Sequence, residues 1–176
     1  MPTPTATRAS AEKSSTSDVQ TSMKPQPRMA PIDPLSLSRT VSELVREDPA
    51  LKGISIDVAG SSTPINADGE LLKIALQNLL LNAAHAMQGQ GRIVISVATA
   101  DGTCRITVTD SGPGIPPQVR EKLFTPFFTT KARGTGLGLS TAKRFLEAHG
   151  GSIAVDCPRS GGTTVTLALP TLQMLA

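Results

Sequence analysis

Two glycine clusters joined by an aromatic segment constrain this chain more than any other feature. The first cluster is DSGPGI at residues 110–115, and the second is GTGLGL at residues 134–139. Glycine permits positive φ and lets backbone approach a ligand closely. A glycine-rich turn that opens a helix also exposes unpaired N–H groups, which suit phosphate. The sequence therefore predicts a nucleotide site around which the other elements are arranged.

The first cluster directly follows a predicted β-hairpin formed by residues 92–98 and 105–110. In its second strand Ile106, Val108 and Asp110 have the same phase, so the Asp110 carboxyl is expected on the core side, where it needs a donor. An aspartate that only caps a turn is the simpler interpretation. The D-x-G-x-G pattern after a strand favours an acceptor for the exocyclic amine of a planar ligand.

A long helix is predicted after Asp68, which is a suitable N-cap, and it ends at Gly89 or Gly91. Its apolar residues fall on one arc that should pack on a sheet. This arc comprises Leu72, Leu76, Leu79, Leu80, Ala83 and Met87.

Asn78, Asn82 and His85 form a polar stripe beside this apolar arc. An exposed polar rim ending in a solvated histidine is one interpretation. Against it, asparagine has poor helix propensity and these two lie in a Leu/Ala-rich helix. Amide oxygens suit Mg²⁺, and a histidine one turn further along can donate to phosphate.

The second glycine cluster opens a helix predicted over residues 137–149. Thr135, Lys131 and Arg133 lie nearby, so phosphates would meet N–H groups, a hydroxyl, a cation and the helix dipole together. The Walker A and Rossmann patterns are both absent. Between the clusters, the Phe residues either belong to the core or anchor a mobile lid over residues 116–133. They are Phe124, Phe127 and Phe128.

The predicted elements indicate an α+β two-layer sandwich with a mixed sheet and helices on one face. Residues 153–156 and 163–169 form a closing hairpin, with Thr163 on its inner face. Ser, Thr, Pro and Ala fill 18 of the first 30 positions, which is typical of a disordered segment. We therefore expect a tail and linker at residues 1–31, one domain at 32–170 and a C-terminal tail at 171–176.

Several other kinds of protein and site are excluded by composition. The net charge of +3 is too small to indicate a nucleic-acid partner. Cys104 and Cys157 fit neither metal spacing nor a disulfide framework, so a reducing cytoplasm is expected. No apolar run approaches the ~18 residues that a membrane span needs. His149, before Gly150, is interpreted as a helix C-terminal cation.

In this order the segments NLLLNAAHAM, DSGPGI, LFTPFFTTK, GTGLGL and GGTTVTLALP resemble the ATP-binding catalytic domain of sensor histidine kinases. That family belongs to the GHKL superfamily, whose members share the Bergerat ATP-binding fold. The resemblance covers residues 32–170. The close spacing of PFFTTK and GTGLGL resembles the short-lid kinases of the nitrogen-regulation type.

The resemblance implies a role for each matching position. Asn82 would hold Mg²⁺ and, with His85 and Lys131, act on the phosphates, while Asp110 would accept from the adenine amino group. The remaining implied ATP contacts are Asn78, Gly112, Gly114, Ile115, Gly134, Thr135, Gly136, Leu137, Gly138, Leu139 and Thr163.

The implied activity is transfer of the ATP γ-phosphate to a histidine. No histidine precedes His85, so the acceptor is expected on a separate dimerisation domain or chain, which in turn serves a response regulator. Two alternatives stay open. One is a catalytically silent, nucleotide-gated interaction module, and the other is a serine kinase of the anti-sigma type.

Overall fold

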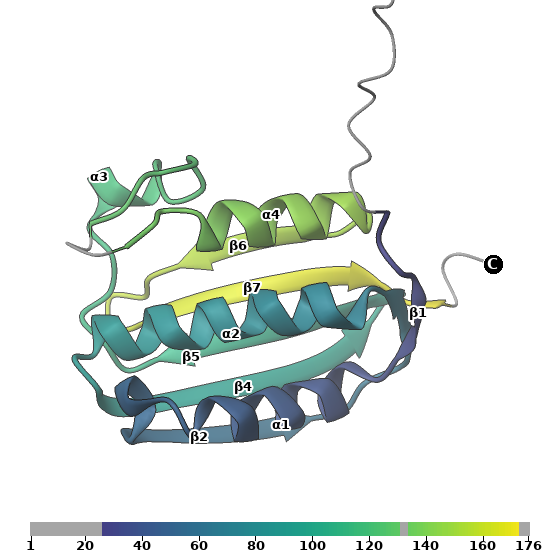
Figure 1. Cartoon of the computed structure of the whole chain (residues 1–176), viewed down its shortest axis with the longest axis horizontal. Coiled ribbons are helices and arrows are strands. Elements are labelled where there is room, and N and C mark those ends of the chain that lie inside the picture. The colour runs from purple at the N-terminus through teal and green to yellow at the C-terminus, as the bar shows by residue number, and fades with distance from the viewer. Residues whose placement is uncertain (1–25, 131–133, 173–176) are drawn as a thin grey trace, which may run out of the picture.

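The computed structural model describes residues 26–130 and 134–172. One face of a five-stranded sheet is covered by three helices, as Figure 1 shows. The strand order is β2-β4-β5-β7-β6, with β2 parallel to β4 and the other neighbours antiparallel. The strands are β2 Gly53–Gly60, β4 Gln90–Ala100, β5 Thr103–Asp110, β6 Ser152–Asp156 and β7 Thr163–Pro170, and the helices α1 Pro34–Val45, α2 Gly69–Ala86 and α4 Gly138–Ala148. The predicted α+β sandwich is confirmed.

A second, two-stranded sheet lies at the end of the domain where the chain enters. Strand β1 (Ala30–Ile32) pairs antiparallel with β3 (Ile65–Ala67). The ordered fold therefore begins before the predicted boundary at residue 32. It also extends further at the other end, because Thr171 donates its N–H to Gly102 at 2.8 Å and Leu172 donates to Pro64 at 3.3 Å. The predicted disorder of residues 1–25 lies outside the described residues.

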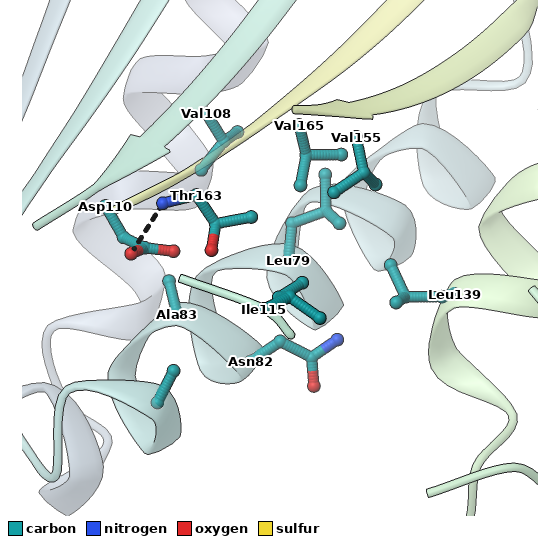
Figure 2. Close-up of a pocket in the computed structure, with 11 residues that line it drawn as sticks. Leu79, Asn82, Ala83, Val108, Asp110, Ile115, Leu139, Val155, Thr163 and Val165 are labelled. Atoms are coloured by element: carbon teal, nitrogen blue, oxygen red, sulfur yellow. Dashed lines mark hydrogen bonds between the residues drawn. The ribbon is translucent and has the colours of Figure 1, made fainter. Parts of the chain in front are cut away.

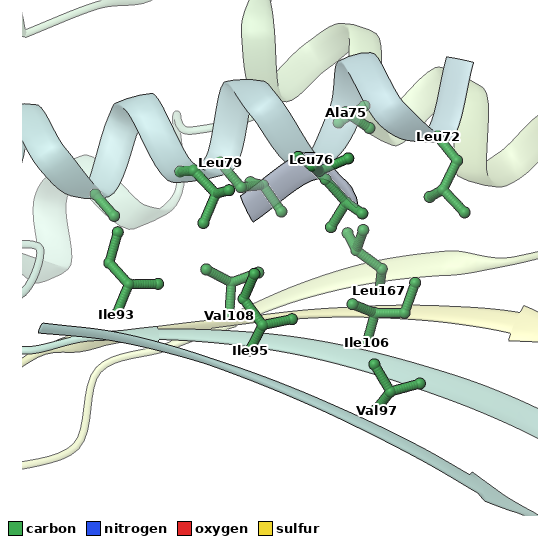
Figure 3. Close-up of a cluster of buried hydrophobic side chains, with 14 of the residues drawn as sticks. Leu72, Ala75, Leu76, Leu79, Ile93, Ile95, Val97, Ile106, Val108 and Leu167 are labelled. Atoms are coloured by element: carbon green, nitrogen blue, oxygen red, sulfur yellow. The ribbon is translucent and has the colours of Figure 1, made fainter. Parts of the chain in front are cut away.

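Helix α2 supplies the centre of the core. All six residues of the predicted apolar arc are buried, and Figure 3 shows several of them facing the strands. Leu72, Leu76 and Leu80 are fully buried, and Ile95 and Ile106 are equally buried on the opposing sheet. Burial of each such side chain contributes about 1.5–3 kcal/mol. None of the helices within residues 26–130 and 134–172 combines the length and apolar character needed to cross a membrane.

Local sequence signals position the strand that carries Asp110. The β4–β5 connection uses Asp101 and Gly102 at φ 50° and 69°, which matches a tight hairpin turn with two left-handed residues. The resulting register places Asp110 opposite Ile93 on β4 and opposite Thr163 on β7. The carboxylate thus sits at a three-strand junction at one end of the sheet.

Two further short helical turns complete the described fold. The turn η1 spans Pro49–Leu51 between α1 and β2, and α3 spans Pro117–Arg120 in the segment between the two glycine clusters. Helix α3 was not predicted.

Candidate nucleotide-binding site

An inner pocket of about 70 Å³ lies between the sheet and α2, as Figure 2 shows. Its wall is mostly apolar. The lining residues are Leu79, Ala83, Ala86, Val108, Ile115, Leu139, Val155 and Val165, with Asn82, Asp110 and Thr163 as the polar members. An apolar slot with a few convergent polar groups suits a flat heterocycle.

Asp110 closes the inner end of this pocket and is 8% exposed. Its Oδ1 accepts the N–H of Gly112 at 2.8 Å and that of Thr163 at 3.2 Å. Both donors converge on Oδ1, so Oδ2 keeps lone pairs for a donor in the pocket. Burial raises the pKa of Asp110 above its ordinary value of 3.8, although the two backbone hydrogen bonds act in the opposite direction.

The loop that follows Asp110 and the loop that precedes Thr163 approach each other closely at a glycine. Gly162 adopts φ +84°, and a Cβ built on it would lie 2.3 Å from the Asp110 carbonyl oxygen. Its N–H donates to the Gly112 carbonyl at 2.8 Å. Sequence reasoning missed Gly162, although the GG pair immediately before β7 marks a backbone position that needs glycine.

A larger groove of about 930 Å³ lies next to the inner pocket. The two cavities adjoin, because Asn82, Ala86, Ile115 and Leu139 line both. One side of the groove is the C-terminal half of α2, and the other is the start of α4 with the loop before it. Its remaining lining residues are Asn78, Leu81, His85, Gly114, Pro116, Val119, Leu123, Phe128, Thr129, Thr130, Gly134, Thr135, Gly136, Leu137, Gly138 and Thr141.

The second glycine cluster brings the two helices close together at the groove. Helix α4 begins at Gly138, where an added Cβ would lie 3.5 Å from the side-chain amide carbon of Asn78. Just before it, Gly136 adopts φ +69°. The first N–H groups of a helix have no partner within the helix and favour anions, so the start of α4 is a suitable wall for phosphate.

Phe127 has an exposed side chain and a left-handed backbone. It is 75% exposed, has φ +65°, and donates its N–H to the Gly136 carbonyl at 3.0 Å. Phe128 lines the groove, and Phe124 is half-buried with the Lys143 ammonium 5.6 Å from its ring centre. The core interpretation is therefore wrong for Phe127.

The structure brings nearly all the predicted site residues together. Every described member of the predicted set lines one of the two cavities except Gly112, which donates its N–H to Asp110 Oδ1. Lys131 and Arg133 lie outside the described residues. The interpretation of His149 as a helix-end cation is wrong, because this side chain is buried and accepts a hydrogen bond.

Comparison with known proteins agrees with this geometry. Residues 67–173 match the profile of the histidine kinase-, DNA gyrase B-, and HSP90-like ATPase family. This chain belongs to that family. Sensor histidine kinase ZraS of Salmonella typhi is 44% identical over 133 residues, which are 73% of this chain and 28% of ZraS. This chain thus spans less than a third of that relative.

Solved structures identify the same domain. The catalytic domain of histidine kinase ThkA has a TM-score of 0.74 and 32% identity, and the match covers 81% of this chain and 95% of that one. Full-length ShkA in complex with AMPPNP has a TM-score of 0.71 and 33% identity over 81% of this chain and 31% of that one. This chain is therefore an ATP-binding catalytic domain of the sensor histidine kinase type.

Proposed function

We propose that this domain binds ATP with Mg²⁺ and transfers the γ-phosphate to a histidine on a separate domain or chain. The observation that carries the proposal is that two unlike cavities adjoin and share four lining residues. An apolar pocket lined by the buried Asp110 lies next to a groove between α2 and the glycine-rich start of α4. A base and a polyphosphate need these two environments side by side.

The base would occupy the inner pocket. Asp110 Oδ2 would accept from the adenine amino group, and the Thr163 hydroxyl would lie beside the ring. Gly114 and Ile115 would form the wall that faces the ring, and Gly112 would hold Asp110 in place. A buried acceptor rejects a base without a donor at that position, because the acceptor would then lack its partner.

The phosphates would lie in the groove between Asn78, Asn82 and His85 on α2 and residues 134–139 on the other side. Backbone N–H groups at the start of α4 would meet their charge. His85 in the last turn of α2 would donate to a phosphate oxygen. Lys131 is proposed as a further phosphate contact, from the sequence alone.

Asn82 suits a magnesium ion shared with the phosphates. Its amide lies where the pocket meets the groove, and an amide oxygen is a hard ligand. Within the part of the chain that the structure describes, no three His, Cys, Asp or Glu side chains gather into a metal site. Mg²⁺ commonly takes few protein ligands and keeps its waters and substrate phosphates, so the donor set fits. The bound ion would neutralise charge on the phosphates during transfer.

Phosphoryl transfer needs positioning and charge neutralisation more than covalent chemistry from the protein. The acceptor histidine would reach the γ-phosphate at the open side of the groove. A solved structure holds histidine kinase ThkA in complex with the response regulator TrrA. By analogy, we propose a response regulator as the partner that receives the phosphoryl group from the acceptor domain.

A reconstituted transfer reaction tests this proposal. The chain is mixed with Mg²⁺, γ-labelled ATP and a separate acceptor domain from a related kinase, and histidine-linked label is measured. We expect label on the acceptor, and Asn82→Ala should reduce it strongly. Gln77→Ala is a matched control, since Gln77 is an amide on α2 outside both cavity linings.

The outcome separates the alternative functions. If ATP binds but the acceptor histidine stays unlabelled, the kinase proposal fails and the silent interaction module is supported. Label on a partner's serine would support the anti-sigma type instead.

A further inference from the structure

Helices α2 and α4 lie side by side and run in opposite directions, as Figure 1 shows. The C-terminal half of α2 and the first turn of α4 line the groove. Their other ends meet at the far side of the helical layer, where α2 is capped by Asp68 and α4 ends at His149.

The His149 imidazole makes a hydrogen bond with each of its ring nitrogens. It is 6% exposed, with Nδ1 2.8 Å from the Phe145 carbonyl and Nε2 3.1 Å from the backbone N of Asp68. Because Nε2 accepts from an N–H, the ring proton is on Nδ1 and donates to the carbonyl. The ring is therefore neutral and held in one orientation, with the Phe145 ring centre 4.1 Å away.

Asp68 links the His149 contact to the segment before β1 as well as to α2. Its Oδ1 accepts the N–H groups of Glu70 and Leu71 at 3.1 and 3.2 Å, and its Oδ2 accepts the Arg28 N–H at 2.7 Å. The pKa of Asp68 is held below 3.8, chiefly by the Arg28 hydrogen bond. Three segments far apart in the sequence are thus joined at one carboxylate and its own backbone N–H.

The residues after His149 fix its position. Gly150 has φ +69°, and Gly151 donates its N–H to the Leu146 carbonyl at 2.7 Å, which closes the end of α4. A Cβ on Gly151 would lie 2.2 Å from the Ala168 carbonyl oxygen of β7. The C-terminal end of α4 therefore packs closely against β7. This contact fixes the position from which the His149 side chain reaches Asp68.

We propose that His149 is a positioning residue for the nucleotide groove. By fixing the far ends of α2 and α4 relative to each other, it sets the separation of their near ends, where Asn82 and Gly138 face the groove. This inference rests on the proposed function, since it assumes that nucleotide lies between the two helices. An apolar side chain would fill the same space without the desolvation cost of a buried imidazole, so packing alone does not account for histidine.

Three substitutions separate the hydrogen bond to Asp68 from packing. H149Q puts an amide group near the Nε2 position, H149N puts one near Nδ1 only, and H149L removes both bonds. Affinity for a non-hydrolysable ATP analogue is measured by calorimetry, well below the melting temperature of each variant. We expect H149Q to bind within about twofold of wild type, and H149N and H149L about tenfold more weakly.

A destabilised control completes the experiment. Val41→Ala removes buried volume from α1, which packs against α2 away from both cavities, and should lower the melting temperature without changing affinity. If H149N and H149L bind as tightly as wild type, the positioning role is overturned and His149 only packs. If H149L does not fold, the difference in nucleotide affinity between H149Q and H149N decides whether the positioning role holds. If wild type binds no nucleotide, the proposed function fails together with this inference.

Discussion

The inner pocket and the outer groove are built in different ways. Asp110 in the pocket is fixed by strand pairing, by two backbone donors on one oxygen and by the close approach of Gly162. The groove wall opposite α2 is the start of α4 and the loop before it. In this loop Gly136 has a left-handed φ and accepts the N–H of Phe127, which also has a left-handed φ. The base side is therefore preorganised by the sheet, and part of the phosphate side depends on a few loop contacts.

This difference separates recognition from transfer. Groups that are already in place lose little freedom on binding, so they contribute most of their interaction energy to affinity. A loop group that becomes ordered only on binding would contribute less of its interaction energy to affinity. Changes on the two sides should consequently have different effects on adenosine and on ATP.

The largest effect is expected at the base side, from Asp110→Asn. The new amide oxygen can accept from Gly112 and Thr163, but its NH₂ would meet the adenine amino group. Loss of a buried charge-assisted hydrogen bond should weaken ATP and adenosine alike by roughly ten- to hundredfold. Calorimetric affinities check this, with Asp156→Asn, at an exposed position on β6, as the control. Unchanged ATP affinity would show that the base assignment is wrong.

The next largest effect is expected at Gly136→Ala. Its Cβ would lie 2.4 Å from the Phe127 carbonyl carbon, and its φ is +69°, so the loop must move. We expect ATP to bind about tenfold more weakly, with adenosine changed by less than about twofold. Gly69→Ala is the control, because a Cβ there meets only Ile32 at 3.5 Å. Equal losses for both ligands would mean that the two sides are not independent.

A smaller effect is expected from pH at Asp110, whose pKa is raised by burial. As the pH falls through this raised pKa, the carboxylate gains a proton and loses acceptor capacity. Adenosine binding should therefore weaken severalfold on acidification, and the midpoint of this loss should lie above pH 3.8. The stability contribution has the opposite sign, because a folded-state pKa above the unfolded value favours the folded state at low pH. Titration of affinity against pH should show this step in wild type but not in Asp110→Asn.

The smallest effect is expected at Phe127, and it concerns stability alone. Phe127→Gly and Phe127→Ala both remove the exposed ring, but only glycine adopts left-handed φ without steric cost. Chemical denaturation should find the glycine variant more stable than the alanine variant by about 1 kcal/mol. Adenosine affinity should be the same in both. Equal stabilities would indicate that the left-handed conformation is not maintained in solution.

The parts of the fold that repeat with a simple period could be predicted from sequence. The 3.6-residue spacing gave the buried arc of α2, and the two-residue spacing of β5 gave the inward direction of Asp110. Asp68 was also recognisable as a cap, because its contacts to Glu70 and Leu71 are local.

Contacts between distant segments could not be predicted in this way. Strand β1 has three residues and includes a proline, so it carries no periodic signal and forms only because β3 pairs with it. His149 resembles an ordinary helix end until Asp68, far away in sequence, supplies the donor. Nothing in the local sequence indicates that Phe127 is exposed, whereas Phe145 shares the buried side of α4 with Ala142 and Leu146 at helical spacing.

The parallel pairing of β2 with β4 has a consequence for how the chain folds. The β4–β5 and β6–β7 pairs are antiparallel neighbours that can close through short local turns. Strand β2 has no partner until β3, α2 and β4 have followed it, and contacts over long sequence separations form slowly. Because α1 and β2 precede α2 and β4 in the chain, we expect their apolar residues to complete their burial only after those later elements have been synthesised.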